Sequence, residues 1–288
     1  MTRLMQYKFI YFILSILIIL PGLFYLITSG LKLGIDFTGG ALLEYKFNKQ
    51  LNPEDINKEI GVITTTGQNT YLIRTKPINQ DEINKIKADL INKFGSVEER
   101  RVESVGPVIG KELTQKALSA LLMASMAIVL YIAFSFRKVP KPASSWRFGI
   151  TAVIALMHDI LVVVGIFAIL GKVWGVEIDT LFVTALLTVI GFSVHDTIVV
   201  FDRVRENLSK NPGKKFADIT NLSIVQTLGR SLNTSLTVIF VLTALLLFGG
   251  ETIKWFVVAL LIGIISGTYS SIFNATALLV WWEEKLGH

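Results

Sequence analysis

The sequence contains no cysteine and few charged side chains. Without cysteine among its 288 residues, the chain can form no disulfide, no cysteine-ligated zinc site and no catalytic thiolate. Charged residues make up 17% of the chain, against about 25% in ordinary soluble domains. The charge is almost absent from six long stretches and normal elsewhere, which indicates segments in contact with membrane lipid and not one large soluble core.

Motifs typical of enzymes and of nucleic-acid-binding proteins are also missing. No GxxxxGK[ST] sequence is present, so an ATP-binding P-loop is not the energy source. No Ser/His/Asp set is evident between the first two apolar stretches, and no basic patch is interleaved with aromatic residues. We therefore expect no enzyme, no nucleic-acid partner and no cofactor. The net charge of +6 fits Lys and Arg at the cytoplasmic ends of membrane helices.

Six apolar stretches are long enough to cross a membrane, which takes about 20 residues of helix. The first lacks charge and exceeds the apolar core of a signal peptide, so we expect a retained span. The predicted spans are residues 9–28, 117–136, 148–170, 180–201, 231–248 and 255–282. All five tryptophans fall at span ends, where an amphipathic ring prefers the headgroup level.

Positive charge is concentrated on one side of these spans. Four Lys or Arg residues lie between the second and third spans, and six lie between the fourth and fifth. The short loops on the opposite side carry only Lys172 and Lys254. The positive-inside rule therefore predicts that both termini are cytoplasmic and that the segment between the first two spans is outside.

The segment of residues 29–112 has the pattern of a small water-soluble domain. Strands are expected at 41–47, 62–66, 69–75 and 96–105, with a hairpin turn around Gly67, and helices at 52–60 and 79–94. The order strand–helix–strand–strand–helix–strand favours a ferredoxin-like sandwich. The predicted fold is thus an all-α membrane protein of six spans with an inserted extracytoplasmic α+β domain. Its parts are residues 1–28, 29–112 and 113–288.

Two spans contain an acid. Asp159 lies about 18 Å into the third span at the helical rise, and Asp196 lies in the cytoplasmic half of the fourth. A carboxylate at such depth is costly unless it is paired, hydrated or protonated. The functional interpretation is a proton or ion relay, and the structural alternative is a static hydrogen bond between helices. The position of Asp196 favours the relay, whereas Asp159 suits both equally.

Each acid directly follows a histidine, which gives the pairs His158-Asp159 and His195-Asp196. A metal site is disfavoured, because neighbouring side chains on a helix point about 100° apart and no Glu or Cys completes a ligand set. The histidines are better interpreted as proton-exchanging or hydrogen-bonding neighbours of the acids.

Further polar and small residues mark the fifth and sixth spans. Arg230 opens the fifth span and heads a polar stripe that is expected to meet Asp196; the alternative is an arginine that reaches to the headgroups. In the sixth span Gly263, Gly267 and Asn274 belong to a small-residue face, which predicts close helix packing.

Three segments resemble signatures of the SecF family of protein-export membrane subunits. The first is LGIDFTGG at residues 33–40, with Asp36, Gly39 and Gly40, where the glycines predict a turn or hinge. The second is VGPVIGKEL at 105–113. The third is GFSVHDTIVVFDRVREN at 191–207, which contains Asp196. The resemblance covers essentially the whole chain.

The resemblance implies a non-enzymatic accessory subunit of the Sec pathway in the bacterial inner membrane, of the resistance-nodulation-division superfamily. Such a subunit pairs with SecD, associates with the SecYEG channel, and uses protons as coupling ion to promote translocation of unfolded preproteins. By motif, Asp196 corresponds to the family's fourth-span acid in proton movement, and Arg230 resembles the basic residue near it. The family usually has Asn where this chain has His195, which leaves the role of His195 open.

Two other functions fit part of the pattern. A proton-coupled small-molecule efflux transporter of the same superfamily would normally carry both six-helix halves and two exterior domains in one chain. A structural scaffold for a channel would use the buried acids only to hold helices together. Replacement of Asp196 by Asn distinguishes the scaffold, because it would then impair assembly and not uncouple an assembled complex.

Overall fold

The structure is a computed structural model that describes residues 4–52, 56, 62–67, 69–140 and 143–286. The helix expected at 52–60 falls almost entirely outside this set. The chain divides into two compact units. The helical unit consists of Met1–Lys32 and Ala120–His288, and the sheet unit consists of Leu33–Ser119.

Within the described residues, six helical segments are long and apolar enough to cross a membrane. They are α1 (Lys8–Ser29, preceded by the short η1, Leu4–Tyr7), α4 (Pro107–Ser135), α5 (Ser145–Trp174), α6 (Thr180–Lys210), α7 (Phe216–Phe248), and a last segment formed by α8 (Glu251–Tyr269), η2 (Ser270–Asn274) and α9 (Ala275–Lys285). The six predicted spans are confirmed.

Several helices continue beyond the apolar stretch that predicted them. α6 runs to Lys210, where Lys210 pairs with Glu206 one turn earlier. α7 begins at Phe216, well before the predicted start of the fifth span. Hydropathy marks only the part of a helix that lipid can cover, whereas i,i+4 ion pairs sustain the polar turns beyond it.

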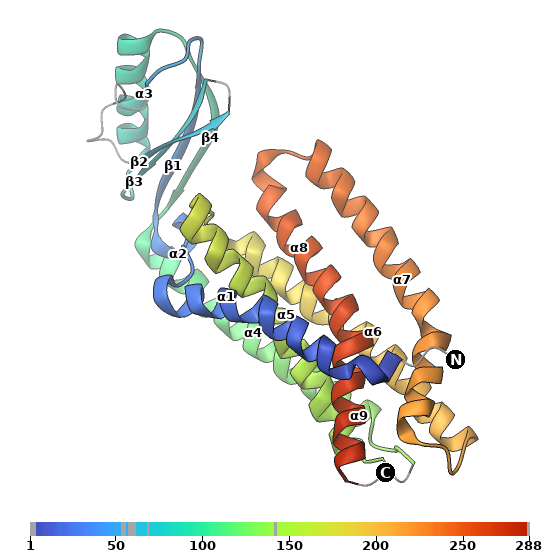
Figure 1. Cartoon of the computed structure of the whole chain (residues 1–288). Helices are drawn as coiled ribbons and strands as arrows, with labels where there is room; N and C mark the ends of the chain where they lie inside the picture. The colour runs from blue at the N-terminus through green and yellow to red at the C-terminus, as the bar shows by residue number, and fades with distance from the viewer. Residues whose placement is uncertain (1–3, 53–55, 57–61, 68, 141–142, 287–288) are drawn as a thin grey trace. The chain divides into compact units, whose positions relative to one another are not determined.

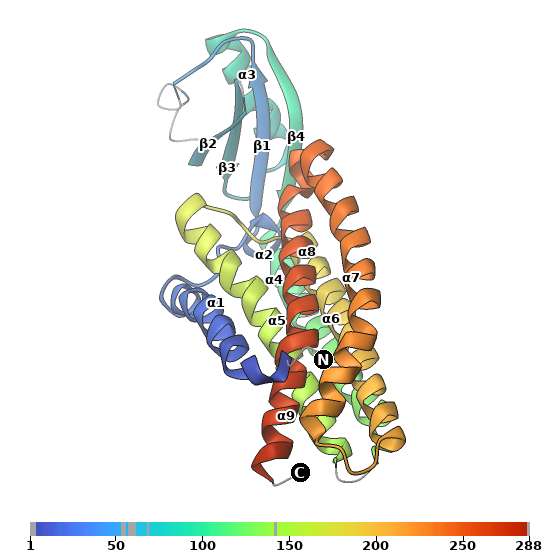
Figure 2. The same ribbon diagram turned by 45° about the vertical axis from the view of Figure 1, so that its right-hand side comes forward.

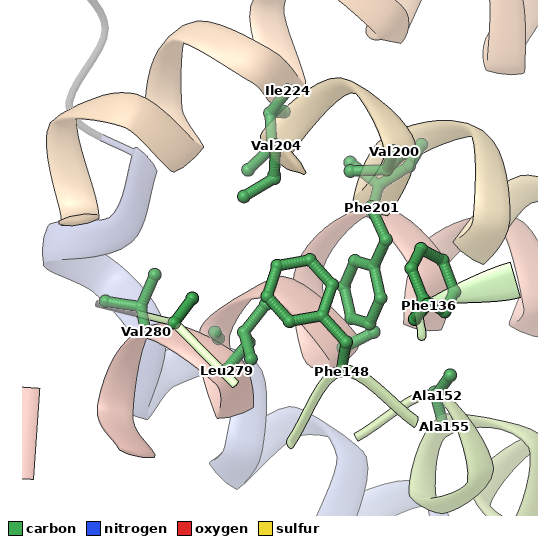
Figure 3. Close-up of a cluster of buried hydrophobic side chains, with 14 of the residues drawn as sticks. Phe136, Phe148, Ala152, Ala155, Val200, Phe201, Val204, Ile224, Leu279 and Val280 are labelled. Carbon is green, nitrogen blue, oxygen red and sulfur yellow. The ribbon is translucent and has the colours of Figure 1, made fainter. Parts of the chain in front are cut away.

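α5, α6 and the last segment form the interior of the helical unit. Half or more of the most apolar window of each is buried, whereas α1, α4 and α7 keep most of theirs exposed. Within a largely aliphatic core cluster, the rings of Phe136, Phe148 and Phe201 lie 5.1–5.8 Å apart between centroids (Figure 3). These three rings join α5 to α6 and to the residue that follows α4.

α1 packs along α5, as both ribbon views show (Figures 1 and 2). The closest approach is backbone against backbone at Gly22 and Gly165. A Cβ at Gly22 would lie 2.7 Å from the Cα of Gly165, so only glycine fits there.

The sheet unit contains β1 (Gly40–Phe47), β2 (Val62–Gly67), β3 (Thr70–Thr75) and β4 (Val97–Val105), with α2 (Ile35–Thr38) and α3 (Gln80–Phe94). Its strands are antiparallel and lie in the order β2-β3-β1-β4. The predicted strands, the hairpin and the helix at 79–94 are confirmed. The hairpin turns at Asn69, whose φ of 58° suits asparagine.

α3 begins and ends as its sequence dictates. The side chain of Asn79 accepts a hydrogen bond from the backbone N–H of Glu82, and the Glu82 carboxylate accepts one from the N–H of Asn79, which forms a capping box. Gly95 ends the helix at φ 88°. Ile83 and Leu90 of α3 pack onto the buried face of β1 and β3.

The glycines at the start of β1 have positive φ, 72° at Gly39 and 144° at Gly40. They bring the α2 turn against the first residues of α4. A Cβ at Gly39 would lie 3.0 Å from the Cα of Pro107, and a Cβ at Gly110 would lie 3.0 Å from the carbonyl oxygen of Phe37. Only glycine therefore fits at Gly39 and Gly110. Asp36 lies in α2, the helical turn beside these glycines.

Candidate functional site

Asp159 of α5 is fully buried and accepts four hydrogen bonds from side chains. Its Oδ1 accepts from His158 Nδ1 at 3.0 Å and from Ser266 Oγ at 2.8 Å. Its Oδ2 accepts from Ser193 Oγ at 2.5 Å and from Ser270 Oγ at 2.6 Å. An ionised carboxylate offers about four lone-pair sites, so these donors fill it.

The last segment reaches this carboxylate through an irregular turn. η2 is a π-helix, a form that occurs mostly as single turns at functional sites. Ser270 opens η2 and Asn274 closes it. In the same region Ser271 bridges to α6, because its hydroxyl donates to the Ser193 carbonyl at 3.0 Å and lies 2.7 Å from Thr197 Oγ1. The π-turn therefore presents successive polar side chains to both α5 and α6.

The glycines that the sequence assigns to packing lie at the crossing of α6 and α8. A Cβ at Gly263 would overlap the Val189 side chain. A Cβ at Gly267 would lie 3.2 Å from Ser193 Cβ and 3.5 Å from Asp159 Oδ2. Gly267 thus clears the room in which Ser193 reaches Asp159. Asn274, assigned to the same face, contacts α1 and α5 through its side-chain amide.

Asp196 of α6 is also buried, at 1% exposure, but its surroundings differ from those of Asp159. Its Oδ1 lies 3.5 Å from His195 Nδ1, and Ser235 of α7 approaches the same carboxylate. Among the described residues, its Oδ2 has no hydrogen-bond partner. The His195 side chain is 61% exposed on the surface of the chain and lies beside a carboxylate with free acceptor capacity.

Arg230 is not brought to Asp196 within this chain. Its side chain is exposed on α7, and none of the ion pairs among the described residues involves it. The buried polar residues of α7 near this depth are Ser231 and Ser235 instead, and the Ser235 hydroxyl lies 2.6 Å from Thr268 Oγ1. The pairing of Arg230 with Asp196 stays a prediction.

A metal site does not form around the two His-Asp pairs. Within the described residues, no group of three or more His, Asp or Glu side chains gathers closely enough to hold an ion. Each histidine instead turns its Nδ1 to the acid that follows it.

The sequence model described as "Protein export membrane protein SecD/SecF, C-terminal" matches residues 85–285. The SecD/SecF GG motif matches residues 24–50. The chain belongs to the SecD/SecF family of protein export membrane proteins.

Relatives of the SecD/SecF family cover the chain almost completely. The chain is 51% identical to protein translocase subunit SecF of Thermobaculum terrenum, over 99% of this chain and 95% of that protein. It is 42% identical to the SecF subunit of Anaerolinea thermophila, over 99% and 95%. It is also 35% identical to protein translocase subunit SecDF of Bacillus subtilis, over 96% of this chain and 37% of that protein.

Solved SecDF structures share the fold. The crystal structure of SecDF from Thermus thermophilus matches with a TM-score of 0.85 at 31% identity, over 97% of this chain. The super-membrane-facing form of SecDF matches with a TM-score of 0.72 at 30% identity. This chain spans 38% and 39% of those chains.

Sequence reasoning missed a buried ion pair that this SecF-family chain forms between α5 and α9. Arg147 Nη1 contacts Glu283 Oε2, and the two side chains are 11% and 0% exposed. Glu283 directly follows two tryptophans at a span end. An acidic residue at a span end, on the same side as a loop rich in Lys and Arg, was the sequence signal for this ion pair. The serine donors of Asp159 left no such signal, because serine is common in small-residue helix faces.

Proposed function

We propose that this chain is a SecF subunit that pairs with a SecD partner, associates with SecYEG and uses the proton gradient to promote translocation of preproteins. The pairing is supported by the relatives in which both parts form one SecDF protein and this chain spans little more than a third of it. The broad apolar exposure of α1, α4 and α7 supports a partner helix bundle as well as lipid.

The proposed subunit lies in the bacterial plasma membrane with both termini in the cytoplasm. The excess of Lys and Arg in the loops between the second and third and the fourth and fifth spans supports this orientation. Residues 29–112 then form an extracytoplasmic ferredoxin-like domain. The antiparallel strand order β2-β3-β1-β4, with α3 between β3 and β4, supports that fold.

The single observation that carries the proton-driven role is the state of Asp196. It is a buried carboxylate with an unpartnered oxygen next to an exposed histidine. An acid with unfilled acceptor capacity loses little when it takes up a proton, so it can alternate between charged and neutral forms. One charge moved through 100 mV supplies about 2.3 kcal/mol, which is enough to bias a helix rearrangement. Asp159, His195 and Arg230 complete the proposed relay.

Replacement of Asp196 by Asn in cells tests this function. We expect proton-dependent secretion of an exported protein to fall to the level of a strain that lacks the subunit, while the variant still co-purifies with its SecD partner. Asp202→Asn is the matched control, because Asp202 lies on the same helix but is exposed and, among the described residues, pairs only with Arg205. Normal secretion by the Asp196 variant would refute the relay. Loss of co-purification would favour the scaffold.

A further inference from the structure

A chain of hydrogen bonds connects Asp159 to the first membrane helix. Asp159 Oδ1 lies 3.0 Å from His158 Nδ1, and His158 Nε2 lies 3.2 Å from Asn274 Nδ2. The same Asn274 Nδ2 donates to Ser15 Oγ at 2.6 Å. The chain therefore runs from α5 through the last residue of the π-turn to α1. Of these residues, only Asp159 also belongs to the proposed relay around Asp196.

The direction of each bond follows from Asp159. As an ionised acid it accepts only, so His158 carries its proton on Nδ1 and donates it to Oδ1. Its Nε2 then has a free lone pair, which accepts from the Asn274 amide. Asn274 is 8% exposed, and among the described residues its Oδ1 has no hydrogen-bond partner. A buried amide oxygen without a hydrogen-bond donor is energetically costly. The oxygen of Asn274 is therefore an unused acceptor beside the histidine.

Protonation of His158 at Nε2 reverses the donor and acceptor roles along this series of hydrogen bonds. Nε2 gains a proton, and the Nδ1 proton passes to Asp159 Oδ1, which leaves a neutral acid and the other neutral tautomer of the histidine. Nδ1 then accepts from the new acid O–H, and Nε2–H needs an acceptor. A half-turn of the Asn274 amide supplies it, because Oδ1 replaces Nδ2 beside the ring. The turn withdraws Nδ2 from Ser15 and so changes the contact with α1.

Ser270 offers the competing route. Its hydroxyl also reaches the Gly267 carbonyl oxygen at 3.3 Å, so it can turn there and accept the acid proton itself. That route leaves the Asn274 oxygen without a donor, whereas the histidine route gives it one. The unpartnered oxygen therefore favours the histidine.

A cavity lies beside His158. It has a volume of about 260 Å³, and His158, Asn274 and Ser15 form part of its wall. The remainder of the wall is mainly apolar and comes from α1, α5 and α9.

Few other titratable groups face this pair. From α8, the Tyr269 ring centroid lies 6.4 Å from that of His158, and the Tyr269 hydroxyl donates to the Tyr11 carbonyl of α1. On α6, Asp196 follows Ser193 by three residues; across α5 and α9, Arg147 is paired with Glu283. No Lys or Arg among the described residues forms an ion pair with Asp159. The charge of the Asp159–His158 pair therefore depends on proton binding and not on a neighbouring Lys or Arg.

We propose that His158 is the proton donor and acceptor of Asp159, and that Asn274 turns with each exchange and transmits the state of Asp159 to Ser15 of α1. The exchange at His158 is independent of the proposed function. The use of this exchange in export rests on the proposed function. The connection to export would be α1, because the chain continues from α1 directly into the sheet unit.

Nitrogen NMR of the histidine rings tests the exchange directly, in the full chain reconstituted in lipid with its SecD partner. The chain has three histidines, and the His158 signal is the one that His158→Gln removes. We expect Nδ1–H to be the dominant tautomer at high pH, and a switch to Nε2–H with the same midpoint as the Asp159 carboxyl carbon signal. An unchanged His158 tautomer while Asp159 titrates would overturn the proposal in favour of Ser270. Absence of any titration from about pH 4 to about pH 10 would overturn it as well.

Asn274→Leu tests the transmission. We expect the His158 tautomer switch to lose its coupling to Asp159, and proton-dependent secretion to fall to the level of His158→Gln. The double variant should be no worse than either single one, because both act in one chain. Thr151→Val is the matched control: Thr151 lines the same cavity, but within the described part of the chain its hydroxyl bonds only to backbone carbonyls of its own helix. Additive losses would overturn the coupling.

The two proposals fail separately. If Asp196→Asn abolishes secretion while the His158 tautomer stays fixed, only the inference about His158 is wrong. If the tautomer switches with Asp159 while Asp196→Asn secretes normally, the relay at Asp196 is wrong and the exchange at His158 stands.

Discussion

At the scale of single residues, Asp159 holds three helical segments together through one side chain. His158, Ser193, Ser266 and Ser270 all depend on its two oxygens. We expect Asp159→Leu to leave these donors without an acceptor and to lower the free energy of unfolding by at least about 3 kcal/mol. Thermal unfolding of the purified chain in detergent measures this effect. Asp159→Asn, which keeps one acceptor oxygen, should cost distinctly less; equal losses would contradict the account.

Tyr45 illustrates the opposite case, a polar group whose burial is not compensated. Its side chain is fully buried in the sheet unit, and among the described residues its hydroxyl has no hydrogen-bond partner. Burial, together with the nearby Glu99 carboxylate, raises the pKa of Tyr45 to about 12. The folded state therefore favours the protonated phenol.

Because this pKa is raised on folding, the stability that it contributes is complete below the unfolded pKa of about 10. It is then lost as the pH rises towards about 12. We expect hydrogen exchange of the β1 and β3 amides to accelerate over this range in the full chain. Tyr45→Phe should remove this pH dependence and leave stability at neutral pH unchanged or slightly higher. A steep alkaline loss that persists in the variant would assign the effect to another group.

Arg230 differs from both residues, since nothing among the described residues holds it in place. Arg230→Ala should therefore leave the free energy of unfolding of the isolated chain within about 0.5 kcal/mol of the original value. If the proposed relay is correct, the same variant lowers proton-dependent secretion. Lys214→Ala, at an exposed position that the proposed orientation places in the cytoplasm, is the control for general loss of positive charge. A large loss of stability would place Arg230 in the packing of the single chain instead.

At the scale of helices and strands, the crossing of α1 and α5 depends on two glycines. A Cβ at Gly165 would lie 2.9 Å from the Cα of Gly22, a backbone atom that can move only with its helix. We expect Gly165→Ala to destabilise the isolated chain by about 1–3 kcal/mol. Gly191→Ala is the control, because no atom lies within 4 Å of a Cβ at Gly191. That control should be neutral or stabilising, since alanine favours helix.

The sequence predicts these elements well where one local property decides them. Apolar length with little charge identifies all six spans, and the polar cap at Asn79 and Gly95 bounds α3 closely. The π-turn at Ser270–Asn274 could not be predicted, because its residues fit a regular helix equally well. The donors around Asp159 come from α5, α6 and the last segment, so only the packed bundle reveals them. For the same reason, the sequence alone does not distinguish a proton relay from a static hydrogen bond at Asp159.

At the scale of the whole chain, the buried polar residues divide into two kinds of site. Asp159 has a complete set of donors, whereas Asp196 has an unpartnered oxygen and an exposed histidine beside it. The first arrangement requires a change of hydrogen-bond direction before a proton can be bound, and the second does not. In the proposed mechanism, a SecF subunit built in this way responds to protons at two acids with different structural consequences.

The contact of Gly22 with Gly165 also has a mechanical consequence. Most helix pairs interlock through side chains, and such ridges resist both sliding and rotation. At this crossing two bare backbones meet, so the resistance is confined to van der Waals contact over a small area. We therefore expect α1 to pivot about this contact, because no interlocking side chains have to separate there. We expect a small displacement of α1 near Ser15, on one side of this contact, to produce an opposite displacement at the end of α1 beyond Gly22.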